Sequence, residues 1–184
     1  MDCDAEWQDF LTTMDLLGEK LGPLIFQFGF FGGSVFKNAG QFLSRLRPFL
    51  QKLPKDRQFV VEIRNRKWLD AQFVDLLREH NVALALTDTS FMLRPWEMKE
   101  PLDLVTADFA YVRWLGDRKG IEEDTTTWDK IVVDRRDDLK NWVDVFKSLT
   151  HNSKVLKIFA FANNHYAGHG PATVKLFHDL WDKR

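Results

Sequence analysis

The sequence predicts an α/β fold built on a parallel sheet. Three observations support this prediction: short apolar runs alternate with amphipathic segments, the runs are rich in β-branched and aromatic residues, and the connections between runs are long enough to hold a helix. Strands joined by such connections run parallel, because a hairpin turn is too short to contain a helix. A TIM-type barrel and an open doubly wound sheet both satisfy this pattern.

Five apolar runs predict buried strands, at residues 24–28, 59–64, 82–88, 109–115 and 155–162. Helices are expected where apolar residues recur at spacings of three and four, at residues 7–21, 39–50, 70–80, 138–149 and 171–181. The connection 116–137 contains Gly120, three threonines and many charges, so we expect a long loop there. No glycine-rich phosphate-binding loop follows any strand, which weakens the doubly wound alternative.

The composition indicates one domain over residues 1–184, of which 45% are hydrophobic. Lys and Arg number 26 against 27 for Asp and Glu, so nucleic acid and anionic membrane surfaces are not expected partners. The acidic N-terminus has no apolar signal segment, and no stretch is long enough to span a bilayer. The single cysteine, Cys3, cannot form an intramolecular disulfide. These features together favour a cytoplasmic protein.

Polar residues gather where the predicted strands end. In the run 59–64, alternation places Glu62 and Arg64 on one face and apolar residues on the other. When the same alternation is applied to the other predicted strands, four further polar side chains lie at or near the strand ends, namely Gln27, Asp88, Arg113 and Asn163. In a barrel the mixed face points inward, so we expect these side chains to converge at the C-terminal mouth, where such folds place their sites.

This cluster predicts a site for a small anionic or polyhydroxylated ligand. Arg64 and Arg113 suit an anion held by paired hydrogen bonds, while Glu62 and Asp88 are candidate acid and base. The alternative is that the same charges form a structural layer of ion pairs inside the barrel. Trp68 either fills the core or forms a wall of the ligand pocket.

The segment 163–171 contributes further candidates. It follows a strand directly, and Pro171 suits the first turn of a helix whose N–H groups would hold a phosphate or carboxylate. Asn163 and Asn164 are candidate ligand-binding residues, and His165 is a candidate proton carrier. The alternative is a turn that only satisfies backbone geometry. Glycines and a proline interrupt the spacing of the two histidines here, so no metal site is expected.

Several of these segments resemble the DUF72 family, also called YecE-like. The likeness runs from about Leu17 to the C-terminus and is carried by residues 21–28, Phe59–Arg64 with Trp68, Tyr111–Gly116, Asp134–Arg135 and Asn163–Pro171. The resemblance implies a TIM-type barrel with polar residues at its strand ends. It implies no established activity or substrate, and the cofactor stays unknown.

The sequence departs from the family pattern at two places. Gly29 and Phe30 stand where the family usually has a double proline. Family members also begin with about three further strands that have no counterpart here, so we expect a partial barrel of about five strands. Such a barrel has two open sheet edges, through which the chain would self-associate.

Two classes of function stay open. The first is an enzyme in which Arg64 and Arg113 anchor the substrate and residues 163–165 orient it. The second is a noncatalytic binding or interaction protein in which the arginine–carboxylate cluster is structural or holds a partner's phosphate. No motif identifies a substrate or a reaction.

Overall fold

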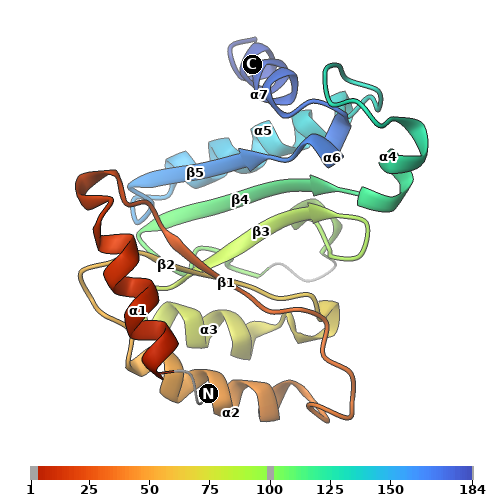
Figure 1. Cartoon of the computed structure of the whole chain (residues 1–184). Helices are drawn as coiled ribbons and strands as arrows, with labels where there is room; N and C mark the ends of the chain where they lie inside the picture. The colour runs from red at the N-terminus through yellow and green to blue at the C-terminus, as the bar shows by residue number, and fades with distance from the viewer. Residues whose placement is uncertain (1–3, 99–101, 184) are drawn as a thin grey trace.

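Five parallel strands form the centre of the fold (Figure 1). The computed structural model describes residues 4–98 and 102–183. The strands follow one another in the order of the chain, as β1 (Leu24–Gln27), β2 (Phe59–Glu62), β3 (Ala83–Thr89), β4 (Phe109–Gly116) and β5 (Lys157–Ala162). Each neighbouring pair is parallel. The predicted α/β class is confirmed, and the arrangement is consistent with a TIM-type barrel that is not closed, since β1 and β5 do not pair within the described residues.

Helices cover one face of the sheet, because each crossover returns the chain to the same strand end. The five predicted helices are present as α1 (Asp4–Asp15), α2 (Ala39–Gln51), α3 (Ala71–Glu79), α5 (Arg136–His151) and α7 (Gly170–Trp181), although the first was predicted to continue to residue 21 and ends at Asp15. Three single-turn segments accompany them, η1 (Gly18–Lys20), η2 (Arg66–Trp68) and η3 (Pro95–Glu97). In Figure 1, α2 and α3 lie beside the β1–β3 half of the sheet, and α5 and α7 lie beside β4 and β5.

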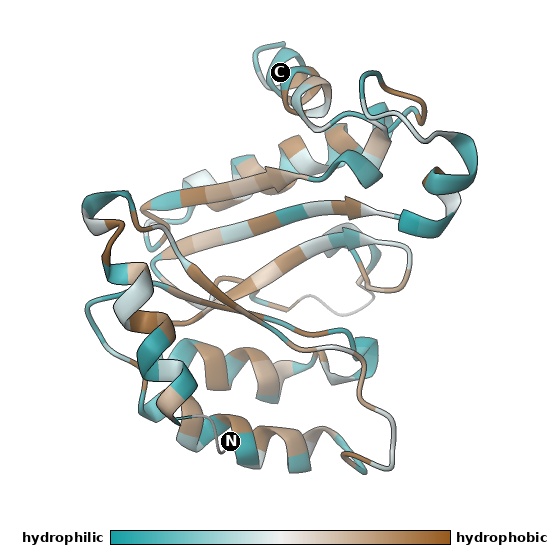
Figure 2. Cartoon of the chain, in the orientation of Figure 1, coloured by the Kyte–Doolittle hydropathy of each residue, from teal (hydrophilic) through white to brown (hydrophobic). Residues whose placement is uncertain are grey.

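Two short helices occupy segments in which the sequence predicted no helix. The first, α4 (Arg118–Asp124), interrupts the expected loop 116–137, and the second, α6 (Asn164–Ala167), lies inside the segment 163–171. Ile121 is the buried residue of α4, and the hydrophilic colour dominates this helix in Figure 2. Neither helix has the apolar periodicity that reveals a helix in a sequence. The loop prediction for residues 116–137 is therefore wrong over α4.

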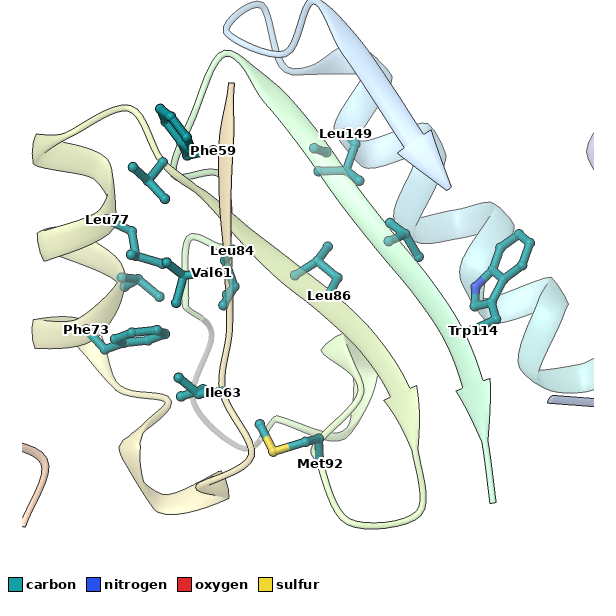
Figure 3. Close-up of a cluster of buried hydrophobic side chains, with 14 of the residues drawn as sticks. Phe59, Val61, Ile63, Phe73, Leu77, Leu84, Leu86, Met92, Trp114 and Leu149 are labelled. Carbon is teal, nitrogen blue, oxygen red and sulfur yellow. The ribbon is translucent and has the colours of Figure 1, made fainter. Parts of the chain in front are cut away.

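The main core lies between the sheet and the helices. Alternate strand residues point to this face, so Val61 of β2 and Leu84 of β3 pack against Phe73 and Leu77 of α3, as Figure 3 shows. At the other end of the sheet, Trp114 of β4 contacts an aromatic group from α5, α6 and α7 that comprises Trp142, Phe146, Tyr166 and Phe177. Because one face of each strand packs against this core, the other side chains of the strand point to the opposite face of the sheet.

The other side of the sheet, called the inner face below, carries a smaller apolar cluster of Val60, Ala83, Ala85, Ala107, Phe109 and Tyr111. Ile25 of β1 and Phe159 of β5 are partly buried against it. Because side chains alternate, Gln27, Glu62, Thr87 and Arg113 share this face near the C-terminal strand ends, and Lys157 shares it at the start of β5. Apart from Lys157 at the start of β5, the inner face is therefore apolar along the strands and polar at their C-terminal ends.

No helix in the described ranges combines the length and the hydropathy that crossing a membrane requires. Cys3 lies outside the residues that the structure describes.

Candidate functional site

A buried carboxylate at the end of β2 forms the floor of the candidate site. The side chain of Glu62 is 1% exposed, and its Oε2 accepts a hydrogen bond of 2.5 Å from Nη1 of Arg113. Its Oε1 forms an ion pair of 2.5 Å with Nη2 of Arg64. Nη1 of Arg113 also donates to Oε1 of Gln27 over 3.1 Å. The prediction that these four side chains converge at the strand ends is confirmed.

The contact between Arg113 and Glu62 depends on the strand that separates them. Arg113 lies on β4 and Glu62 lies on β2, with β3 between them. On the inner face β3 presents Ala83, Ala85 and Thr87, of which Thr87 is the register partner of Arg113. These side chains are short, so they leave space for the long guanidinium side chain to cross the strand.

Among the residues that the structure describes, the two guanidinium groups still have N–H donors without a protein acceptor. Each arginine has five N–H donors, and the contacts of Arg113 with Glu62 and Gln27 both use Nη1. Burial raises the pKa of the neighbouring Tyr111 hydroxyl. The charge of Arg113 opposes this shift, and the charge of Glu62 adds to it. The phenol therefore stays neutral near pH 7. The floor therefore combines one carboxylate with two cations and a neutral phenol.

These residues border an open pocket of about 410 Å³ at the C-terminal strand ends. Five of the predicted site residues line it, namely Gln27, Arg64, Arg113, Asn163 and His165. The end of β3 and the segment after it add Thr89, Ser90 and Phe91, and the end of β4 with the start of α4 adds residues 115–119. The guanidinium of Arg64 lies 4.9 Å from the ring centroid of Phe91, which orients that arginine. Four basic lining residues against one acidic residue favour an anionic ligand.

His165 lies at the rim of the pocket, on the short helix α6. Gly116, at the end of β4 with φ +72°, passes so close to α6 that a Cβ atom there would lie 2.3 Å from the carbonyl oxygen of His165. The ring Nδ1 is 2.8 Å from Oδ1 of Asn163, and Nε2 is 3.1 Å from Oε1 of Glu122 on α4. The same Oδ1 accepts the backbone N–H of His165, which fixes the orientation of the Asn163 amide.

Glu122 belongs to this rim although nothing in the sequence singled it out. Its carboxylate accepts a hydrogen bond of 2.8 Å from Nε of Arg118, which is the main cause of its lowered pKa, and His165 contributes less. Glu122 and His165 are far apart in the chain, and only the packing of α4 against α6 brings them together. Both ring nitrogens of His165 therefore face oxygen acceptors.

Asn164 does not line the pocket. Its Oδ1 accepts the backbone N–H of Gly170 over 2.8 Å, and this bond stabilises the turn between α6 and α7. Pro171 follows in the first turn of α7, as predicted, and has no N–H to offer. The prediction that the first N–H groups of this helix hold an anion is therefore wrong at Gly170, whose N–H is already bonded.

The predicted position of Asp88 is also wrong, because this residue lies on the helix-covered face. Its register partner on β4 is the core residue Trp114, whereas Thr87 and Arg113 share the inner face. Asp88 is 1% exposed, and its Oδ1 accepts from Nε of Arg94 at 2.7 Å. Its Oδ2 accepts from Nε1 of Trp142 at 2.8 Å and from the hydroxyl of Tyr166 at 2.9 Å.

The Asp88 network links β3, α5, α6 and the segment before η3. Burial lowers the pKa of Arg94, but the hydrogen bond and charge of Asp88 outweigh it, so the pKa is raised overall. Burial also raises the pKa of Tyr166, and Asp88 adds to this shift, so the phenol remains a neutral donor. Since Tyr166 follows His165 directly, the network positions the helix that carries the histidine.

Trp68 also lies on the helix-covered side, where it is 9% exposed. It stacks on Phe31 and Phe42 at ring-centroid distances of 6.1 and 5.1 Å. Of the two alternatives left open for this residue, the structure supports the core position, and Trp68 does not line the pocket.

Within residues 4–98 and 102–183, no three His, Cys, Asp or Glu side chains lie close enough to hold a metal ion.

Comparison with known protein families matches residues 1–184 to the family described as "Protein of unknown function DUF72". A comparison with curated proteins finds no match. Two solved structures are similar in fold. A DUF72 family protein from Thermotoga maritima MSB8 shares 20% identity at a TM-score of 0.67, with 100% of this chain and 65% of that chain covered. A DUF72 family protein from Enterococcus faecalis V583 shares 18% identity at a TM-score of 0.59, with 94% and 66% covered. The chain thus spans slightly less than two thirds of each.

Replacing Asp88 with alanine tests its position in the structure. The change leaves the buried donors of Tyr166 and Trp142 without an acceptor and Arg94 without its main counter-ion. We expect the Asp88→Ala variant to lose about 3–5 kcal/mol of unfolding free energy in urea titrations. Asp137→Ala is the matched control, because that carboxylate is 92% exposed and its removal should change stability little. Equal stability of the two variants would place Asp88 outside any buried network.

Proposed function

The chain belongs to the DUF72 family, whose description assigns no function, and on that premise we propose that it binds a small anionic or polyhydroxylated ligand in the pocket at its C-terminal strand ends. The observation that carries the proposal is the buried carboxylate of Glu62, which pairs with two arginines that both line the pocket. One buried carboxylate balances only one of the two guanidinium charges. The surplus positive charge is best neutralised by an anionic ligand.

The pocket also has the dimensions of a ligand site. Small-molecule sites commonly measure about 300–1,000 Å³ and place a few polar groups among apolar walls. At about 410 Å³, this pocket is at the smaller end of that range. Its polar groups come from β1, from β4 and from the segments directly after β2 and β5, so the sheet holds them in fixed relative positions.

An enzyme is the second candidate, supported by the acid–base groups within the site. Glu62 lies beneath the pocket and His165 lines it. In the present arrangement both oxygens of Glu62 contact arginines, and both ring nitrogens of His165 face acceptors. Proton transfer by either residue would require the ligand to displace one of these contacts. The geometry therefore favours binding as the primary role.

The binding proposal predicts that Arg113 is essential for affinity. A panel of small carboxylates, phosphates and sugars is screened for compounds that raise the melting temperature, and the best one is titrated calorimetrically. Arg113→Ala should weaken its binding by about 1.5–3 kcal/mol, the usual value of a hydrogen bond to a charged group. Arg45→Ala, at an exposed position on α2, should bind as the unchanged chain does. Normal binding by Arg113→Ala would assign the cluster a structural role.

We also propose that the chain self-associates through β1 and β5, each of which has one strand neighbour in the described part of the chain. Unpaired strand edges attract further strands, and on β5 the side chain of Phe161 is 49% exposed. Phe161→Lys places a charge beside this edge and should lower the average mass measured by light scattering at high concentration. Val174→Lys on α7, at a position that is 38% exposed, should leave this average mass unchanged. A monomeric starting protein would contradict this proposal.

A further inference from the structure

The charged residues around the pocket form two groups, one at its floor and one at its rim. The net charge differs between the two groups. At the floor, Glu62 faces both Arg64 and Arg113, so one positive charge has no carboxylate partner among the described residues. Both arginines are largely buried, with side chains 17% and 24% exposed, so this surplus is only partly screened by water. The floor therefore offers a site for one negative charge.

The rim carries no comparable surplus. The lining there holds the cations Arg118 and Lys119 and the anion Asp117, and Glu122, which is not itself a lining residue, contacts Arg118 at 2.8 Å. Glu122 contacts both Arg118 and His165, so the basic groups nearest to it already have an acceptor within the protein. A second negative charge on a ligand that approached Arg118 or His165 would compete with the carboxylate of Glu122 for these groups. Two negative charges that share the same cations repel each other.

Between floor and rim, the pocket offers neutral amide donors. Oε1 of Gln27 accepts from Arg113, and Oδ1 of Asn163 accepts from His165, so each amide has its NH₂ group left to donate. Hydroxyl oxygens are suitable acceptors for these donors. The hydroxyl of Ser90, at an exposed position of the lining, can both donate and accept. This distribution suits a carbon chain with several hydroxyl groups.

An apolar wall completes the pocket. Phe91 is 47% exposed and lies under the guanidinium of Arg64, beside the floor. An exposed ring next to a cation gives the carbon skeleton of a ligand a surface to pack on while its charged end reaches the arginines.

We infer that the pocket takes a polyhydroxylated monocarboxylate, such as a sugar acid, and that Glu122 is a specificity-determining residue which excludes ligands with a second negative charge. This inference rests on the proposed ligand-binding function and narrows it to one chemical class. The carboxylate of the ligand contacts Arg113 and Arg64 at the floor, its hydroxyl groups meet the amides of Gln27 and Asn163, and its far end approaches Glu122.

A matched series of six-carbon compounds tests the inference. Sorbitol, D-gluconate and D-glucarate share a hydroxylated chain and carry zero, one and two negative charges. Each is titrated calorimetrically into the full chain at low ionic strength, with inorganic phosphate as a fourth probe. Gluconate should bind at least about tenfold more tightly than the other three, since about 1.4 kcal/mol of interaction gives a tenfold change.

Glu122→Gln then tests the role of the rim carboxylate. This variant should bind D-glucarate about tenfold more tightly than the unchanged chain does, because one repulsive charge is removed. Glu123→Gln removes the same charge from an exposed neighbouring position and should leave the affinity for D-glucarate unchanged. If Glu122→Gln and Glu123→Gln bind D-glucarate equally, the role assigned to Glu122 is overturned.

The remaining outcomes separate the inference from the function on which it rests. Tighter binding of D-glucarate or phosphate than of D-gluconate, lost in Arg113→Ala, would overturn the ligand class while leaving the pocket an anion site. Failure of all four probes to bind would overturn the ligand class as well, and the wider compound screen would then decide the proposed function independently.

Discussion

The ion pairs of Glu62 with Arg113 and Arg64 are the interaction on which the candidate site depends. They join β2 to β4 across β3, and Gln27 extends the same contact to β1. Burying a carboxylate is costly unless cations and hydrogen-bond donors compensate it, and here two guanidinium groups do so. The small inner-face residues of β3 make the contact sterically feasible. The pocket above the pairs follows from this arrangement.

A second buried carboxylate supports the site from the other face of the sheet. Asp88 accepts hydrogen bonds from Arg94, Trp142 and Tyr166, which come from three different segments of the chain. Because Tyr166 follows His165 on α6, these bonds help to fix the rim of the pocket without reaching the ligand. The two carboxylates therefore have different roles: Glu62 holds the floor, and Asp88 holds the elements that surround it.

Much of the fold could be predicted from the sequence, but part of the site could not. The run 59–64 alternates between charged and apolar residues, so the face of Glu62 was predictable. The run 82–88 is apolar on both faces, so the sequence pattern did not show on which face Asp88 lies. The helix α4 has one buried residue and α6 has four residues in all, too few for a periodic signal. The contact of Glu122 with His165 depends on the packing of these two helices.

A double-mutant cycle between Glu62 and Arg113 would test most directly whether the floor of the pocket is one interacting unit. Glu62→Gln, Arg113→Met and the double variant are compared by urea unfolding. We expect each single variant to lose several kcal/mol, because each leaves a charge near the floor uncompensated, and we expect the double variant to lose about 1–3 kcal/mol less than the sum. Losses that add to within about 0.5 kcal/mol would show that the two side chains act independently and would contradict the role of their ion pair in the floor of the pocket.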